Sequence, residues 1–341
     1  MKKISRLLAL LMALAMAVSL AACSNDSGDV SAPASQPADD TSASPSTDGQ
    51  TYTVGIIQQM QHVALDSATQ GFQDALTELL GDAVTIDYKN ASGETANCTT
   101  IVGDFVASNV DLIMANGTTA LQAAATGTST IPILGTSITE YGVALGIDGF
   151  TGTTGYNVSG TSDLAPLDQQ AEMLHTWFPD AQTVGLLYCS AEPNSQYQVD
   201  TVQGYLEDLG YTCTQYSFSD SNDLSAVASS ACTASDVLYV PTDNTAANNA
   251  ELIGNISLDT GTPIIAGEEG ICKGCGVATL TISYYDIGYK TGEMAYDILV
   301  NGADPATMPI EYAPQFTPKY NPTMCEALGL TPPDGYEAIA E

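Results

Sequence analysis

The sequence predicts an α/β protein made of two doubly wound lobes, each a mainly parallel sheet with helices on both faces. Three observations predict this fold class. Short apolar runs alternate with helix-length amphipathic segments from Tyr52 onward, the alternation occurs twice, and a stretch rich in glycine and threonine at residues 142–160 separates the two series. The length of 341 residues also suits two domains of ordinary size.

The first series is expected to form one lobe. Its apolar runs are continuous, which indicates parallel strands that are buried on both faces. The expected strands are residues 52–57, 84–88, 110–115 and 131–134, and the expected helices are residues 65–80, 95–108 and 118–126.

The second series repeats this pattern without close sequence similarity to the first. The expected strands are residues 183–188, 211–217, 236–240, 263–266 and 277–281, and the expected helices are residues 164–178, 194–209, 223–232 and 245–260. Residues 142–160 are interpreted as a crossover into this lobe. Their glycines at 149, 152 and 155 are spaced GxxGxxG, which is not the dinucleotide-binding GxGxxG and is more typical of a flexible loop.

Residues 1–22 have the features of an export signal. Three basic residues precede an apolar run at residues 7–18, and small residues precede Cys23. The run is too short to span a bilayer as a helix. Since Leu20-Ala21-Ala22-Cys23 resembles the bacterial lipobox, we expect Cys23 to carry a lipid; the alternative is an ordinary secretory signal with a chance cysteine.

Residues 23–50 are expected to form a lipid-anchored flexible linker. They are mostly Ser, Thr, Pro, Gly, Ala and Asp, and such a segment cannot bury enough apolar surface to fold. As a flexible coil the segment reaches roughly 30 Å. We therefore expect an extracytoplasmic protein, held at the outer face of a bacterial cell membrane.

The charge is strongly negative. Three of the seven basic residues lie in the first 22 positions, which leaves four lysines against 40 acidic residues and a net charge of −36 for the remainder. No cationic surface is available to neutralise phosphates, so nucleic-acid binding is excluded. Electrostatic attachment to anionic lipid is excluded for the same reason.

Seven cysteines follow Cys23, and an odd number outside the cell implies a free thiol or an intermolecular bond. Cys272 and Cys275 are expected to form a local disulfide or to remain free, because no second Cys or His pair completes a zinc site. Cys213 and Cys232 are expected near one another, since the start of one strand and the end of the next helix lie at the same end of a parallel sheet.

Enzyme motifs are absent from the sequence. It contains no GxSxG, GxxxxGK[ST], HExxH or EF-hand pattern, so we expect no catalytic residues, no metal site and no cofactor. His175 is expected on a helix surface. His62 follows the first strand and Asp66 could orient it, but a pair without a third partner is a weak catalytic signal, and a capping or ligand-contact role is favoured.

Polar clusters follow the expected strands in both lobes, and open α/β sheets bind ligands at the carboxyl ends of their strands. Hydroxyls and free amides at helix starts can hold a carboxylate without arginine. The candidate ligand-binding residues are Met60, His62, Thr118, Thr119, Thr136, Ser137, Asn194, Ser195, Asp243, Glu268, Glu269 and Tyr284.

Five segments carry a family resemblance. They are Val54-Gly55-Ile56, Gln61-His62-x-Ala64-Leu65-Asp66, Asn157-Val158-Ser159-Gly160-Thr161-Ser162-Asp163, Tyr239-Val240-Pro241-Thr242-Asp243-Asn244 and Tyr284-Tyr285-Asp286-Ile287-Gly288. On these segments the chain resembles the ABC-importer substrate-binding proteins of the tryptophan/tyrosine-binding type, which have the type I periplasmic-binding fold. The many cysteines depart from the family pattern.

The resemblance implies three crossovers and a hinge. Lobe one would comprise residues 51–158 and 284–312, and lobe two residues 159–283 and 313–341. A ligand would lie in the cleft between the lobes. A monomeric closed form would then dock on a membrane permease that works with an ATPase.

The resemblance also suggests how an amino acid would be held. Glu268, Glu269 or Asp243 would accept the α-ammonium, and the Gly-x-Glu-Gly context shared with branched-chain amino-acid receptors points to Glu269. The carboxylate would meet the hydroxyls and amides of residues 118, 119, 136 and 137, and the side chain would meet Met60, His62 and Tyr284. An aromatic amino acid such as tryptophan or tyrosine is favoured.

Alternatives to this hypothesis remain open at the level of sequence. The ligand could be a branched-chain amino acid or another small polar solute. The protein could be a sensory receptor of the same fold, or an extracellular enzyme.

The first prediction concerns Cys23. If its lipid is the membrane attachment, Cys23→Ala leaves the protein soluble or uncleaved, because nothing else in the chain anchors it. Fractionation of cells that express each form measures this. A processed Cys23→Ala protein that still sediments with membranes contradicts the prediction.

Overall fold

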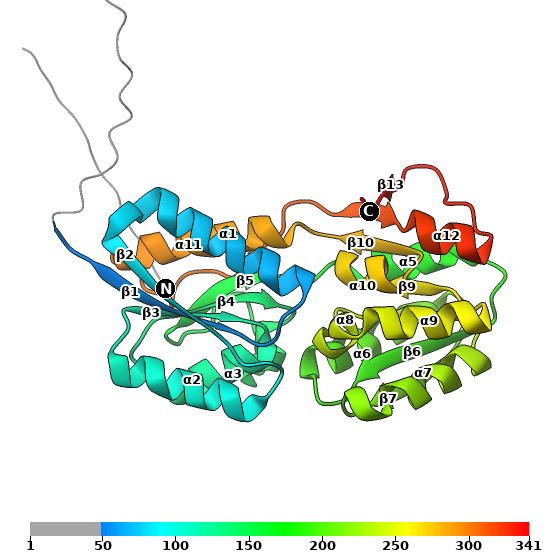
Figure 1. Ribbon diagram of the computed structural model, residues 1–341, viewed down its shortest axis with the longest axis horizontal. Coiled ribbons are helices and arrows are strands. Elements are labelled where there is room, and N and C mark those ends of the chain that lie inside the picture. The colour runs from blue at the N-terminus through cyan, green and yellow to red at the C-terminus, as the bar shows by residue number, and fades with distance from the viewer. Residues whose placement is uncertain (1–48, 341) are drawn as a thin grey trace, which may run out of the picture. The chain divides into compact units, whose positions relative to one another are not determined.

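The computed structural model describes residues 49–340, so the expected signal, Cys23 and nearly all of the linker lie outside the described residues. The described chain contains two β-sheets with helices on both faces of each (Figure 1). The predicted fold class is therefore confirmed. Within residues 49–340, no helix has the length and apolar character needed to cross a membrane.

The first sheet has six strands in the order β11-β5-β4-β3-β1-β2, all parallel. Its strands are β1 (Tyr52–Gln58), β2 (Val84–Asn90), β3 (Leu112–Asn116), β4 (Ile133–Ile138), β5 (Val158–Ser162) and β11 (Glu311–Tyr312). Its helices are α1 (Val63–Leu80), α2 (Thr95–Ser108), α3 (Thr118–Gly127), α4 (Tyr141–Leu145) and α11 (Tyr284–Leu299), with the short 3-10 helix η1 (Gly81–Ala83) after α1.

The second sheet has seven strands in the order β13-β12-β10-β9-β8-β6-β7, and only the β10–β12 pair is antiparallel. Its strands are β6 (Thr183–Cys189), β7 (Thr212–Phe218), β8 (Val237–Val240), β9 (Ile264–Ala266), β10 (Ala278–Thr281), β12 (Thr317–Tyr320) and β13 (Glu337–Ala338). Its helices are α5 (Leu167–Trp177), α6 (Pro193–Asp208), α7 (Ser221–Ala234), α8 (Asn244–Asn248), α9 (Ala250–Thr260), α10 (Glu269–Gly274) and α12 (Pro322–Leu328).

The chain passes between the two sheets three times: after β5, before α11 and after β11. All of β5 belongs to the first sheet, so the first passage comes after Ser162, whereas the expected lobe boundary was at 158/159. After the later passages, α11 packs on α1 and β12 joins the second sheet.

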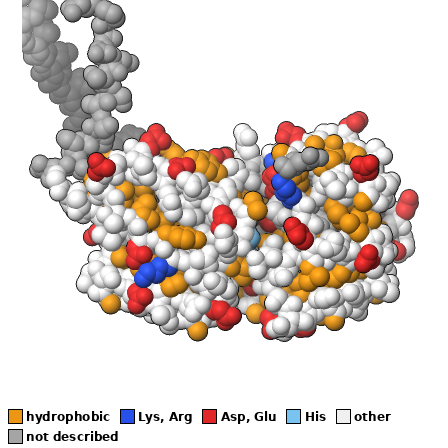
Figure 2. Space-filling model, in the orientation of Figure 1, with side chains coloured by type: hydrophobic (Ala, Val, Ile, Leu, Met, Phe, Trp, Pro, Cys, Tyr) orange, Lys and Arg blue, Asp and Glu red, His pale blue; other side chains and the backbone are white. Residues whose placement is uncertain are grey.

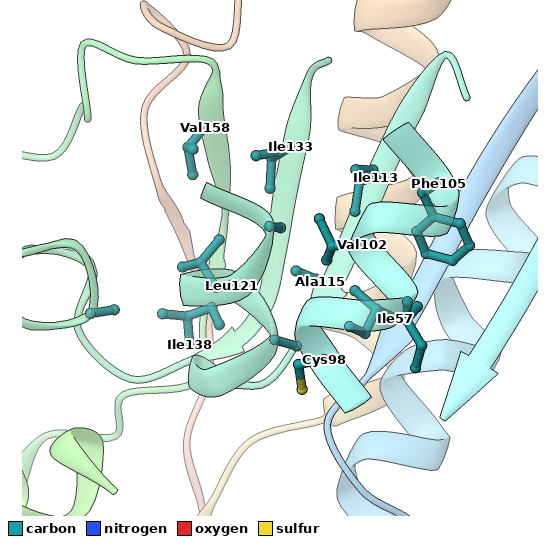
Figure 3. Close-up of a cluster of buried hydrophobic side chains, with 14 of the residues drawn as sticks. Ile57, Cys98, Val102, Phe105, Ile113, Ala115, Leu121, Ile133, Ile138 and Val158 are labelled. Atoms are coloured by element: carbon teal, nitrogen blue, oxygen red, sulfur yellow. The ribbon is translucent and has the colours of Figure 1, made fainter. Parts of the chain in front are cut away.

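Each sheet has its own hydrophobic core on each face. In the first sheet, Ile57 and Ile113 point toward Val102 and Phe105 of α2 (Figure 3), while Val54 and Ile56 face α1 and α11. The second sheet divides in the same way between a cluster under α5 and α6 and a cluster under α7 and α9. Continuous apolar strand sequences are needed because both faces of each sheet are covered.

Three expectations for the second lobe concern one helix and its cysteines. The helix expected at residues 245–260 is broken into α8 and α9 at Asn249, whose φ of −122° is not helical and whose side chain donates to the Thr245 carbonyl. The seven cysteines among residues 49–340 are all free, so the local disulfide considered for Cys272 and Cys275 is not formed. The expected proximity of Cys213 and Cys232 is wrong, because they belong to cores on opposite faces of the sheet.

Close contact between α1 and α11 depends on two glycines. A Cβ at Gly288 would overlap the backbone carbonyl of Ala68, and a Cβ at Gly71 would overlap that of Tyr285. We predict that Gly288→Ala lowers the free energy of unfolding by about 1–3 kcal/mol, because backbone atoms cannot move aside as a side chain can.

The matched control is Gly204→Ala on the exposed face of α6, where nothing lies within 4 Å of the added methyl group. It should raise the free energy of unfolding by about 0.5–1 kcal/mol through helix propensity. Urea denaturation of both variants measures the difference. Equal stabilities for the two variants would contradict this account of the α1–α11 contact.

Candidate ligand-binding site

Polar loops from both sheets meet at the carboxyl ends of the strands. His62 lies between β1 and α1, and its Nε2 is 3.1 Å from Oδ1 of Asn244, the first residue of α8. This contact joins the strand-end loops of one sheet to those of the other. It occurs where open α/β sheets are expected to hold ligands.

A cavity of about 230 Å³ lies at this junction. Residues from both lobes line it, among them Gln59, Met60, Thr119, Ala191, Glu192 and Thr245. A larger cavity of about 680 Å³ is lined by α11 and by residues 311–317, beside the crossovers and away from the strand-end loops. The chemistry of the polar side chains, and not cavity size, therefore indicates where a ligand would bind.

The first lobe uses most of its expected donors internally. The Thr119 backbone N–H donates to Gln59 Oε1 at 2.9 Å, and the Thr136 hydroxyl is 3.0 Å from that of Thr161. Thr118, at the first position of α3, is buried. Thr136 and Ser137 lie within β4, which runs four residues farther than the expected strand, and not in a loop after it.

Ser137 is the exception in this lobe. Its φ of +55° is rare for a residue other than glycine, and its buried hydroxyl has no partner among the described residues. Strained backbone of this kind is tolerated where the surroundings hold it, often at binding sites. Ser137 therefore offers a fixed donor to a ligand.

In the second lobe, Glu192 organises the loop before α8. Its Oε1 accepts from the Thr245 N–H at 2.8 Å and from the Thr245 hydroxyl at 2.7 Å. Its Oε2 accepts from the Asn244 N–H at 3.0 Å and from Asn244 Nδ2 at 2.7 Å. Because Nδ2 donates to Glu192, Asn244 must present Oδ1 to His62, so His62 Nε2 is the donor.

Asp243 is the N-cap of α8 and has little freedom for a ligand. It accepts the Ala246 N–H at 2.8 Å and the Cys189 N–H at 2.7 Å, one on each oxygen. Burial, and next the charge of Glu192, raises the pKa of Asp243. Ser195 also donates to Asp243.

Asn194 lies next to Ser195 in α6. Its Nδ2 donates to the Thr242 carbonyl, and its buried Oδ1 has no hydrogen-bond partner among residues 49–340.

Glu268 and Glu269 separate, although they are adjacent in sequence. Glu268 is the N-cap of α10, is buried, and accepts the Gly270 and Ile271 N–H groups at 2.6 and 2.5 Å. Glu269 points away and forms an ion pair with Lys319 at 2.7 Å. The structure therefore places Glu268 in the buried polar network, whereas Glu269, the acceptor favoured from sequence, already has a cationic partner.

Asp163, which was not among the candidate site residues, lies at the first crossover. It is buried, and Oδ2 accepts the Tyr284 hydroxyl at 3.0 Å. The Tyr284 ring packs against Ala64 and Ala68, so Tyr284 is placed to position Asp163 and not to stack on a ligand. Asp163 follows the buried strand β5 directly, which is the sequence signal that could have identified it.

His62 is placed as a contact residue. Burial lowers its pKa below 6.5, so the imidazole is neutral at pH 7. Asp66 does not orient its ring, because the Asp66 carboxylate accepts from Gln58 Nε2 at 2.6 Å. His175 is occupied by the Tyr211 hydroxyl at 2.8 Å. Among the described residues, no cluster of three His, Cys, Asp or Glu could hold a metal ion.

The model of the ABC transporter substrate binding protein family matches residues 53–340. The chain belongs to this family. The present chain is 36% identical over 249 residues to the curated tyrosine-binding protein of Clostridioides difficile (strain R20291). The match covers 72% of each of the two chains. The fold is that of type I periplasmic binding proteins, as the following structural matches show.

An ABC domain from Streptococcus pneumoniae in complex with L-tryptophan has a TM-score of 0.81 at 29% identity and covers 85% of this chain and 100% of its own. A ligand-free, open substrate-binding protein with adhesive properties from Clostridium difficile has a TM-score of 0.66 at 34% identity, with coverages of 85% and 99%. A leucine-binding protein from Thermotoga maritima, at 15% identity and a TM-score of 0.58, shares the fold.

The buried carboxylates give a prediction on pH and stability. Burial raises the pKa of Asp163 to about 6 and that of Glu268 to about 7, against about 3.9 and 4.3 in an unfolded chain. The folded state therefore binds more protons between pH 4 and 7, so this contribution to stability is complete below pH 4 and is lost as the pH rises to 7. The melting temperature of the ligand-free protein should be higher at pH 5 than at pH 8.

Repulsion among the many acidic side chains also lowers the melting temperature as the pH rises. Variants are therefore needed to isolate the contribution of Asp163 and Glu268. Asp163→Asn with Glu268→Gln should reduce the difference in melting temperature between pH 5 and 8. Asp236→Asn is the control, because hydrogen bonds from Gln182 and Thr183 lower the pKa of that exposed carboxylate, which is ionised throughout this window. An unchanged difference in the double variant would show that the two groups are not buried as described.

Proposed function

We propose that this chain binds a small zwitterionic solute, in particular an aromatic amino acid, between its two lobes and delivers it to an ABC permease. The observation that carries the proposal is a set of buried, unpaired polar atoms with opposite hydrogen-bonding roles, at the carboxyl end of β4 and just after β5 and β6. The Ser137 hydroxyl can donate to a carboxylate, whereas Asp163 Oδ1 and Asn194 Oδ1 can accept from an ammonium group. A zwitterion satisfies both.

Other ligand classes fit this set less well. Sugars and nucleosides carry no cation, and they would leave the buried carboxylates without a counter-charge. The relatives support the same class, since one is named a tyrosine-binding protein and another was solved with L-tryptophan. A branched-chain amino acid is the alternative within the class.

The carboxylate of the ligand would meet Ser137 and the start of α3, where Thr118 and Thr119 lie. The side chain would extend toward Met60 and His62 and the cavity of about 230 Å³ beside them. Asn194 and Ser195 would border the site from the second lobe. In this arrangement residues 51–162 with 284–312 form one lobe, and residues 163–283 with 313–341 form the other.

Closure of the lobes on the ligand would be a hinge motion at the three crossovers. The chain is more similar to the tryptophan complex, with a TM-score of 0.81, than to the open ligand-free relative, with 0.66, although the second is the closer in sequence. The His62–Asn244 hydrogen bond between the lobes supports a closed arrangement.

The remaining parts of the proposal concern the cell. A lipid on Cys23 would hold a monomer at the outer face of the membrane, and the linker would let the body reach a permease that works with an ATPase. The protein itself would perform no chemistry. A sensory receptor would bind the same ligand but would not be needed for its uptake.

A thermal-shift screen of the purified chain against amino acids, sugars and nucleosides tests the proposal. A ligand at a hundred times its dissociation constant stabilises a protein by about 2.7 kcal/mol, so tyrosine or tryptophan should raise the melting temperature. Ser137→Ala should weaken that shift, while Ser225→Ala, an exposed change on α7, should leave it intact. A shift with sugars or nucleosides and with no amino acid would overturn the proposal.

A further inference from the structure

We propose that Asp163 and Glu268 together receive the ammonium group of the ligand, and that binding of this group expels a proton from the pair. This inference rests on the proposed function and deepens it. It assigns the positive end of the zwitterion to two buried residues, one at the first crossover and one at the start of α10, and it makes binding dependent on pH.

Asp163 has the free acceptor. Its side chain is buried, and the Tyr284 hydroxyl occupies Oδ2 at 3.0 Å, while Oδ1 has no partner among residues 49–340. A buried carboxylate oxygen without a hydrogen bond is costly. An N–H group supplied by a ligand would satisfy it.

Glu268 supplies the second charge. Burial raises the pKa of Glu268, the charge of Asp163 raises it further, and both charges act on the Tyr284 hydroxyl. The two N–H groups that Glu268 accepts belong to the backbone of α10 and carry no net charge. Two buried carboxylates in this arrangement repel one another when both are ionised.

No basic side chain of the described residues balances them. Residues 49–340 contain no arginine and four lysines, and none of these lysines forms an ion pair with Asp163 or Glu268. Lys319 pairs with Glu269 and Lys273 bonds the Ala340 carbonyl. Lys89 pairs with Asp87 and Asp104, and Lys290 pairs with Glu293. The positive charge must therefore come from a proton or from the ligand.

The other buried acids at the junction are less suitable. Each oxygen of Asp243 already accepts a backbone N–H, and each oxygen of Glu192 accepts at least two hydrogen bonds from its own lobe. The oxygens of Glu268 are also occupied, so Glu268 contributes its charge, which interacts with that of Asp163, and not a free acceptor. Among these acids, Asp163 alone combines burial with a free acceptor in the part of the chain that the structure describes.

The groups around the pair favour protonation in the free protein. Tyr284 of α11 donates to Asp163, and Thr139 and Tyr141 are near it; Glu268 is near Tyr284, Glu269, Cys272 and Cys275. Lys273 and Lys319 line a cavity with Glu268, but they bond Ala340 and Glu269. No cationic group is among those that shift the pKa of either carboxylate. With pKa values of about 6 and 7, the pair holds about one proton at pH 6.5.

An ammonium group between the carboxylates favours their ionised forms, so the proton leaves to solvent when the ligand binds. Affinity should therefore rise with pH between 5 and 8. Titration calorimetry of the full chain with L-tyrosine, in buffers of different ionisation enthalpy, counts the protons. We expect about one proton released for each L-tyrosine bound at pH 6.5 and almost none at pH 8.5. The affinity for L-tyrosine should be at least about tenfold weaker at pH 5 than at pH 8.

Asp163→Asn should weaken L-tyrosine binding by about 10- to 100-fold, as expected for loss of a charged hydrogen bond, and should reduce the proton release. Asp236→Asn is the control: it removes an exposed carboxylate that accepts from Gln182 and Thr183, away from the pair, and both quantities should stay as in the wild type. The deaminated analogue 3-(4-hydroxyphenyl)propanoate, which has no ammonium group, should bind the wild type without releasing a proton.

The outcomes separate the two proposals. If L-tyrosine, L-tryptophan and the other amino acids do not bind at all, the proposed function fails and this inference with it. If L-tyrosine binds the wild type without proton release at pH 6.5, or binds Asp163→Asn within about threefold of the wild type, the inference is wrong while the proposed function stands. Wild-type calorimetry decides this even if the variant does not fold.

Discussion

Burial of carboxylates without a cationic neighbour is the constraint on which this molecule's binding site depends. Asp163, Asp243 and Glu268 are all buried, and the lysines of the described chain have their partners elsewhere. Burying a charge away from water costs free energy. In the free protein these carboxylates therefore either have a raised pKa or destabilise the fold when they ionise. The site is therefore unfavourable without a ligand and becomes favourable with a cation.

The architecture explains how such a site can exist. Each sheet has complete hydrophobic cores of its own, so the stability of each lobe does not require a dry, apolar contact between them. Parallel strands bring their carboxyl ends to one edge, where N-caps such as Asp243 and Glu268 begin the next helices. The polar groups that cap the starts of these helices therefore lie at the edge where a ligand would bind.

The sequence predicts the sheets well, because continuous apolar runs and amphipathic helices result from burial on both faces. It also predicts polar loops that follow strands such as β1 and β8. It does not predict which of two adjacent acids turns inward: Glu268 and Glu269 are equivalent in a pattern, and only the start of α10 makes Glu268 the cap. Asp163 was missed because its importance comes from contacts with Tyr284, far away in sequence, and not from any local motif.

A crystal structure of the full chain with bound L-tyrosine tests the central claim most directly. The account predicts the ammonium nitrogen about 2.7–3.2 Å from Asp163 Oδ1 and a carboxylate oxygen at the same range from the Ser137 hydroxyl. An ammonium group held by Glu269, or a ligand in the cavity of about 680 Å³ beside α11, would contradict it.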